Sequence, residues 1–212
     1  YAGKEPRIRL ISQENGGYGE AMNRGLDAAQ GEYIGIVEPD DYVDLDMFRD
    51  LYGIARKQGL DFVKADFYRF TRDADGKEQN RYICLDEEKA HYNQVFDPSQ
   101  RPEAIRFTLN TWCGIYRRFF LEQHHIRHNE TPGASFQDNG FFFQTFIYGK
   151  RAMIVDRPYY HNRRDNPNSS VKSKGKVYCM NVEYDFIQDI LKREPEIWER
   201  FKYMYWWRKY HS

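Results

Sequence analysis

Short apolar segments alternate with longer amphipathic ones along the first part of this chain. Tyr33–Val37 is apolar and β-branched between a glycine and a proline, which is the pattern of a short buried strand. The amphipathic segments Tyr18–Gln30 and Asp46–Gln58 are each followed by a glycine, a common way for a helix to end. This alternation of strand and helix patterns predicts an α/β domain.

The rest of the chain predicts more strands and helices in a less regular order. Asp73-Ala-Asp-Gly76 is a hairpin-turn signal, and Asp138–Tyr148 is a strongly aromatic helical segment. Mixed short strands after an early strand–helix alternation indicate a partly mixed sheet. We expect further strands at Arg7–Ser12, Asp61–Phe70, Arg81–Leu85, Trp112–Tyr116, Ala152–Val155 and Tyr159–Asn162, and further helices at Pro102–Leu109, Arg118–His124, Val177–Lys192 and Pro195–Tyr210.

Composition narrows the class of protein. Lys plus Arg and Asp plus Glu both number 32, so the chain has no overall positive field for nucleic acid. The three cysteines Cys84, Cys113 and Cys179 have no zinc-site spacing, and reduced thiols favour a cytoplasmic setting. No apolar run could span a bilayer, and no signal peptide is visible. Gly17-Tyr-Gly19 lacks the third glycine of a dinucleotide-binding loop, which disfavours a dehydrogenase.

Three acids follow the Tyr33–Val37 strand directly: Glu38, Asp40 and Asp41. Carboxylates held together repel each other unless a cation joins them, and a set of oxygen ligands suits Mg²⁺ or Mn²⁺. The carboxyl ends of strands in open α/β sheets are also where ligands bind. The other interpretation is a solvated acidic turn that begins the next helix. These residues alone leave both interpretations open.

The residues around this strand resemble a known family. The expected helix Tyr18–Gln30 follows the loop Asn15-Gly-Gly. It precedes Gly31-Glu-Tyr, which begins the strand before the three acids. This order resembles the nucleotide-sugar half of a family 2 glycosyltransferase with the GT-A fold. That family has an Asn-x-Gly loop, a helix with Ala-x-Asn-x-Gly-x-x-x-Ala, and a Gly-Glu-Tyr strand ending in Asp-x-Asp-Asp. Glu38 stands at the first acid of the last motif, and Asp40 is intact. The matching positions are Ala21, Asn23, Gly25, Ala29, Gly31, Glu32 and Tyr33.

Later segments continue the resemblance in the expected order. Thr131–Phe141 resembles the family's Glu-Asp pair before a Phe-rich helix, with Gln137-Asp138 at the pair. Asn110–Arg117 resembles its Trp-x-Lys-Leu-Tyr-Arg stretch, with glycine near the lysine. Arg157–Arg163 with Asn168–Ser170 resembles its C-terminal Tyr-rich and Ser-Ser stretch.

The resemblance implies an architecture and two units. The family begins with a strand, a helix and a strand ending in Asp-Asp-Gly-Ser, whereas this chain starts at Tyr1 just before the expected Arg7–Ser12 strand. We therefore expect the first βαβ unit to be missing. Residues 1–174 would form a GT-A domain with a Rossmann-like mixed sheet flanked by helices, and residues 175–212 a C-terminal helical extension.

The resemblance also assigns site residues, for most of which a structural role stays open. Asp138 could be a plain helix cap, His161 a surface histidine, Arg163 part of a solvated basic loop, and Trp112 a core residue. The implied roles are metal binding (Mn²⁺ or Mg²⁺) by Asp40, Glu38 and His161, donor binding by Gly17, Asn23, Asp41 and Arg163, acceptor binding by Trp112 and Gln137, and catalysis by Asp138 as the base.

The implied function is inverting transfer of a sugar from a nucleotide-sugar donor, a UDP-sugar, to a saccharide or lipid-linked acceptor in surface polysaccharide synthesis. The alternative is a catalytically silent carbohydrate- or nucleotide-binding module. Trp198–Tyr210 mixes aromatic and basic residues at helical spacing, which suits either packing or peripheral contact with the inner face of the membrane. The sequence indicates no oligomeric state.

Overall fold

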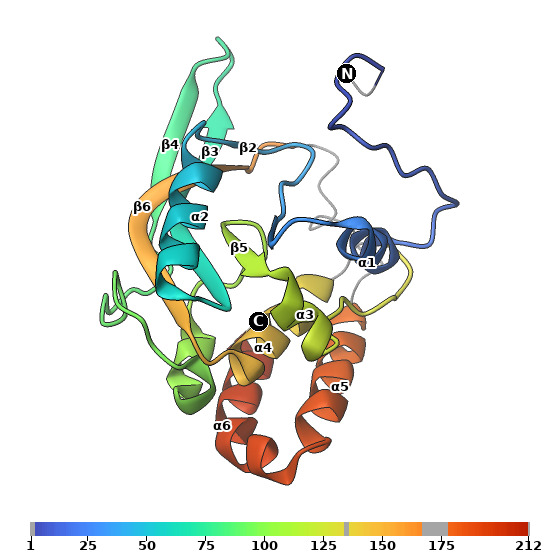
Figure 1. Ribbon diagram of the computed structural model, residues 1–212, viewed down its shortest axis with the longest axis vertical. Helices are drawn as coiled ribbons and strands as arrows, with labels where there is room; N and C mark the ends of the chain where they lie inside the picture. The colour runs from blue at the N-terminus through green and yellow to red at the C-terminus, as the bar shows by residue number, and fades with distance from the viewer. Residues whose placement is uncertain (1–2, 134–135, 167–177, 212) are drawn as a thin grey trace.

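One mixed sheet forms the centre of the computed structural model, which describes residues 3–133, 136–166 and 178–211 (Figure 1). The strand order is β1-β5-β3-β6-β2, and β4 pairs with the outer half of β3. Only the β3–β6 pair is parallel; the four other pairs are antiparallel. The strands are β1 (Tyr33–Gly35), β2 (Tyr42–Val43), β3 (Phe62–Arg72), β4 (Glu78–Ile83), β5 (Gly114–Arg117) and β6 (Ala152–Arg163).

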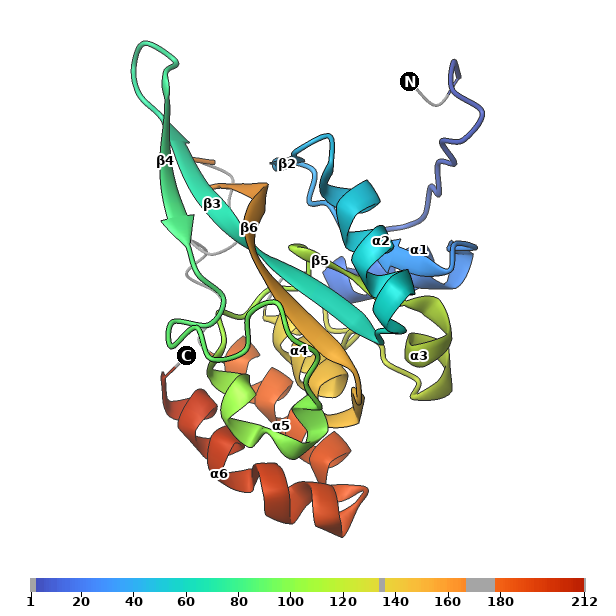
Figure 2. The same ribbon diagram turned by 60° about the vertical axis from the view of Figure 1, so that its left-hand side comes forward.

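Helices flank this sheet, and two of them lie beyond one of its ends. The β3–β4 hairpin projects from one end of the molecule, and the paired helices α5 and α6 lie at the other (Figures 1 and 2). Asp46 precedes α2, and Gly59 ends it with φ near 61°, a left-handed conformation that glycine adopts without strain. The helices are α1 (Tyr18–Ala28), α2 (Met47–Gln58), α3 (Arg118–Gln123), α4 (Gln137–Tyr148), α5 (Cys179–Lys192) and α6 (Pro195–His211), with 3₁₀ turns η1 (Pro98–Gln100) and η2 (Pro102–Arg106).

The core is aromatic and continuous between the sheet and the C-terminal helices. Helix α4 is buried on nearly every side, which explains its run of phenylalanines. Phe143 of α4 packs edge-on against Tyr184 of α5, and Tyr184 against Tyr205 of α6. The boundary between residues 174 and 175 stays a prediction, but the described helices beyond it share one apolar core with the sheet.

The structure corrects several expected elements. Arg7–Ser12 is not a strand: among the described residues no strand pairs with it, and Leu10 is 80% exposed. The two strands expected around Pro158 are one, β6. Its pairing with β3 shifts register there, so two charged residues and a proline interrupt the apolar pattern without ending the strand. The expected helix at Pro102–Leu109 is the 3₁₀ turn η2, and the two-residue β2 was not expected. Asn168–Ser170 lies outside the described residues.

Candidate active site

The three acids lie together between β1 and β2, and we call Glu38, Asp40 and Asp41 the acidic turn. Asp41 joins this turn to the end of β6. Its carboxylate accepts hydrogen bonds from the Tyr160 hydroxyl at 2.8 Å, the Asn162 side-chain amide at 3.0 Å and the Arg163 backbone N–H at 2.7 Å. Even so, burial raises the pKa of Asp41, because these donors do not fully offset lost hydration.

Glu38 is held from two sides. Its Oε1 accepts a 2.8 Å hydrogen bond from the Tyr18 hydroxyl at the start of α1, and its backbone N–H donates to the Tyr160 hydroxyl at 2.9 Å. Burial raises the pKa of Glu38, the Tyr18 hydrogen bond opposes this, and the charges of Asp41, Asp138 and Asp40 raise it further.

Asp40 accepts a hydrogen bond from the side-chain amide of Asn166, after β6, at 2.8 Å. It is partly exposed. Within residues 3–133, 136–166 and 178–211, no three His, Cys, Asp or Glu side chains are close enough together to hold a metal ion by themselves. A divalent ion here would therefore need oxygens from a ligand as well, as Mg²⁺ sites commonly do. The carboxylates of the acidic turn fit that chemistry.

Asp138 lies in the first turn of α4, next to the acidic turn. Its charge raises the pKa of both Tyr18 and Glu38, which places these groups within electrostatic reach of one another. Burial raises the pKa of Asp138 itself, while its own backbone N–H, that of Asn139 and the guanidinium of Arg208 partly oppose this. The residue before α4, Phe136, has φ near 62°, and its strained backbone orients this first turn.

Sequence reasoning missed Glu183, which supports Asp138 from α5. This buried carboxylate accepts hydrogen bonds from the Gly140 backbone N–H at 2.8 Å and the Asn129 side-chain amide at 3.0 Å. A Cβ at position 140 would lie 2.4 Å from a Glu183 oxygen, so glycine permits this approach. Burial raises the pKa of Glu183 to about 7. The sequence signal that could have indicated Glu183 is a glutamate on the apolar face of an amphipathic helix.

The predicted donor-binding residues Gly17 and Asn23 hold the loop before α4 against α1. Gly17 has φ near 96°, and a Cβ there would lie 2.7 Å from the carbonyl oxygen of Thr131. Asn23 donates to the His128 carbonyl and the Glu130 carboxylate, both at 2.9 Å, and accepts from the His128 backbone N–H at 2.8 Å. The side-chain amide of Asn23 thus bonds to other residues of the protein, so we interpret Asn23 as a residue that positions the loop before α4.

The predicted acceptor residues differ in placement. Trp112 is partly exposed and stacks on Tyr160, with ring centroids 4.3 Å apart, beside the acidic turn. Gln137 is buried, and its amide donates to the Thr131 hydroxyl at 2.9 Å and to backbone carbonyls of the same loop. This geometry supports Trp112 as an acceptor contact and gives Gln137 a structural role.

His161 and Arg163 complete the predicted set. His161 lies between Tyr160 and Asn162, whose side chains both reach Asp41, so its own side chain leaves the opposite face of β6. There it contacts Asp44 at 3.1 Å and stacks on Tyr42. The structure thus separates His161 from the acidic turn, and we omit it from the metal proposal. Arg163 lies beside the turn, with its guanidinium paired to Asp165 at 2.5 Å.

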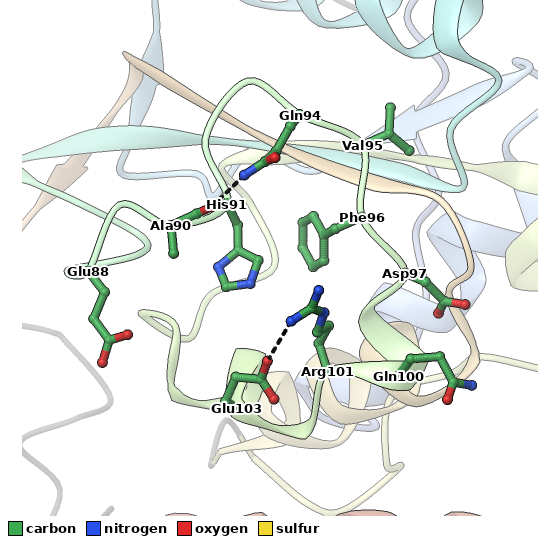
Figure 3. Close-up of a pocket in the computed structure, with 10 residues that line it drawn as sticks. All are labelled: Glu88, Ala90, His91, Gln94, Val95, Phe96, Asp97, Gln100, Arg101 and Glu103. Atoms are coloured by element: carbon green, nitrogen blue, oxygen red, sulfur yellow. Dashed lines mark hydrogen bonds and ion pairs between the residues drawn. The ribbon is translucent and has the colours of Figure 1, made fainter.

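Two cavities lie away from the acidic turn. One of about 640 Å³ is lined by residues 88–103, with His91, Phe96 and Arg101 directed into it (Figure 3). The loop that lines it pairs with Ala152 and Ile154 at the start of β6, whereas the acidic turn contacts the end of that strand. A second, of about 300 Å³, lies between α1, α4 and α5. Neither adjoins the acidic turn.

Curated relatives of this chain are glycosyltransferases. The uncharacterized glycosyltransferase EpsJ of Bacillus subtilis is 33% identical over 175 residues, which is 80% of this chain and 48% of EpsJ. The cholesterol galactosyltransferase of Borreliella burgdorferi is 27% identical over 201 residues, covering 92% of this chain and 54% of the relative. This chain thus spans about half the length of these relatives.

Solved structures show the same fold. The crystal structure of S. aureus TarS 1-349 in complex with UDP-GlcNAc superposes with a TM-score of 0.64 at 17% identity, over 87% of this chain and 49% of that one. The predicted GT-A type mixed α/β fold is confirmed. The sequence model described as Glycosyl transferase family 2 matches residues 1–154, which is most of the chain. The chain belongs to glycosyl transferase family 2.

Proposed function

We propose that this protein transfers a sugar from a UDP-sugar to a saccharide or lipid-linked acceptor with inversion at the anomeric carbon. The observation that carries the proposal is the position of Asp138: a carboxylate with a raised pKa, at a helix N-terminus, within electrostatic reach of Glu38. Donor phosphates near the acidic turn and an acceptor hydroxyl near Asp138 would place the sugar between them. The UDP-GlcNAc complex of TarS, which shares this fold, supports the choice of donor.

Different residues of the chain have different roles in the proposed reaction. Asp138 removes the proton from the acceptor hydroxyl, and its raised pKa makes it a stronger base than an exposed aspartate. Tyr18 and Tyr160 fix Glu38 and Asp41, so the acidic turn is preorganised before ligands arrive. Trp112 offers a flat surface for a sugar ring.

A divalent ion is the expected cofactor. Asp40, together with Glu38, would hold Mn²⁺ or Mg²⁺ beside the donor phosphates. When bound, such an ion acts as a Lewis acid that stabilises the negative charge growing on the departing diphosphate.

Calorimetric titration with UDP, with and without Mn²⁺, tests this function on the Asp40→Ala variant. We expect Asp40→Ala to abolish Mn²⁺-dependent UDP binding, because it removes an ion ligand and leaves the sheet intact. Asp75→Ala, at the exposed hairpin turn, is the matched control and should bind as the parent does. Unchanged UDP–Mn²⁺ affinity in Asp40→Ala would refute the metal assignment. Metal-independent sugar binding without transfer would favour the silent module.

The setting of the reaction stays a prediction. In the described residues, no helix is both long enough and apolar enough to cross a membrane. Helix α6 exposes Tyr203, Trp206 and Tyr210 on one side, with exposed fractions of 69%, 39% and 79%. Such a stripe suits peripheral contact with the inner face of the membrane during surface polysaccharide synthesis.

A further inference from the structure

Three arginines lie side by side where β4, β3 and the end of β6 meet. Arg69 of β3 is directly opposite Arg81 of β4, and its other neighbour in the register is Asn162 of β6. Arg164 follows β6, and its backbone N–H donates to the Phe70 carbonyl at 2.9 Å. We call Arg69, Arg81 and Arg164 the arginine cluster.

The positive charges of this cluster are not balanced within the described chain. Burial and the charges of Arg164 and Arg81 all lower the pKa of Arg69. Arg69 Nε is buried and has no hydrogen-bond partner among the described residues. The neighbouring arginines differ, because Arg72 pairs with Glu78 and Arg163 with Asp165.

The remaining residues of the chain contain no acid that could balance this charge. Residues 1–2, 134–135, 167–177 and 212 include no Asp or Glu, and residues 167–177 add three lysines. Like charges directly opposite each other on neighbouring strands destabilise a sheet. A cluster of this kind is therefore more consistent with a bound anion than with a structural role.

The cluster shares a sheet face with the candidate active site. The Arg69 guanidinium lies over the Phe67 ring, 5.8 Å from its centroid. Phe67 packs edge-on against Trp112, with centroids 4.8 Å apart, and Trp112 stacks on Tyr160, whose hydroxyl bonds Asp41. A strip of aromatic rings thus leads from the arginine cluster to the acidic turn.

We propose that the arginine cluster binds an anionic group, phosphate or carboxylate, on the acceptor. This inference rests on the proposed function and specifies its acceptor as a negatively charged saccharide chain. Guanidinium groups bind both anions with paired, charge-assisted hydrogen bonds. Phe67 and Tyr160 are buried, whereas Trp112 is partly exposed and suits a sugar ring of the same chain, because tryptophan presents a flat amphipathic face.

Ligand-observed NMR on the protein saturated with UDP and diamagnetic Mg²⁺ tests this site with sn-glycerol 3-phosphate, glucuronate and, as the neutral control, glucose. We expect at least one anion to bind the parent and glucose not to bind. The triple variant Arg69→Gln, Arg81→Gln, Arg164→Gln should weaken anion binding by about 10-fold or more, the scale of a charged hydrogen bond. Arg101→Gln makes the same change of charge at the distant cavity and should bind as the parent does. Tighter phosphate binding would identify a phosphate-bearing acceptor, and tighter glucuronate binding a uronate-bearing one.

Two further measurements distinguish an acceptor site from a donor-phosphate site and from a purely structural cluster. UDP affinity in the triple variant should equal the parent value; a parallel loss of UDP affinity would assign the cluster to the donor's phosphates and overturn the proposal. The melting temperature of Arg69→Gln should not fall, because the substitution removes like-charge repulsion. Anions that bind the parent and the triple variant equally, or bind neither, would also overturn it. If UDP fails to bind the parent while arginine-dependent anion binding persists, the proposed function fails and the anion site stands.

Discussion

At the scale of single residues, the candidate active site concentrates negative charge that the surrounding protein does not neutralise. Burial raises the pKa of Glu38, Asp41 and Asp138, and each of these groups lies within electrostatic reach of another acid. Hydrogen bonds from tyrosine, asparagine and backbone donors oppose this rise in pKa, and at Asp138 the guanidinium of Arg208 opposes it as well. A cation in the ligand-bound state would relieve the repulsion.

Asp138→Asn tests the base directly. Asparagine keeps the size of the side chain and an oxygen that can accept from the helix N-terminus, so the melting temperature should change little. It cannot take a proton, so sugar transfer should fall by at least about 10²-fold while UDP–Mn²⁺ affinity stays at the parent value. In the parent, transfer should increase with pH through a midpoint above the ordinary aspartate range, because the raised pKa delays ionisation of Asp138.

The matched control for this variant is Asp185→Asn on the outer face of α5, where the carboxylate is 70% exposed and ion-paired to Lys209. It should keep parental transfer and parental pH dependence. Full transfer in Asp138→Asn would mean that another group is the base. Loss of UDP affinity or of folding in that variant would show instead that Asp138 acts as a helix cap.

At the scale of elements, α5 fixes the first turn of α4 through Glu183. The folded state raises the pKa of Glu183 from 4.5 to about 7, so between these values the folded protein binds more protons than the unfolded chain. The stabilisation from this group is therefore complete below pH 4.5 and is lost as pH rises to about 7. The upper limit is about 3 kcal/mol, from about 1.4 kcal/mol for each unit of pKa.

Glu183→Gln should remove this part of the pH dependence. Denaturant unfolding between pH 5 and 8 should give a free energy of unfolding that declines more steeply in the parent than in Glu183→Gln. Glu199→Gln, an exposed acid on α6, is the control and should keep the parental slope. Equal slopes in Glu183→Gln and the parent would mean that Glu183 has an ordinary pKa in the folded protein.

The sequence predicted the elements better than the contacts among them. Local patterns located α1, α2, α4, α5 and α6 to within about two residues, because caps and periodicity are local signals. Arg7–Ser12 has the alternating pattern of a strand but does not form one, because no strand of the described structure pairs with it. A local pattern cannot show whether a pairing strand exists. The motif resemblance selected the acids and Asp138 as candidates. It did not indicate the residues that support them, because Tyr160 and Asp41 are 119 positions apart.

At the scale of the whole molecule, the C-terminal helices and the sheet form one body through the aromatic core. Phe201 of α6 is fully buried in the apolar cluster that includes α4 and the central strands. Arg208 of the same helix opposes the raised pKa of Asp138, so α6 also acts on the candidate base. We infer that the sheet and the C-terminal helices unfold together.

Phe201→Ala tests this cooperativity. Truncating a buried phenylalanine should cost about 3–5 kcal/mol of stability, through lost burial and the cavity that remains. If α6 belongs to the same cooperative unit, amide exchange by mass spectrometry should show α6 and β3 losing protection by equal amounts. Tyr203→Ala, on the exposed side of the same helix at 69% exposure, is the control and should leave both unchanged. Protection lost in α6 but kept in β3 would show that α6 does not belong to the cooperative unit of the sheet.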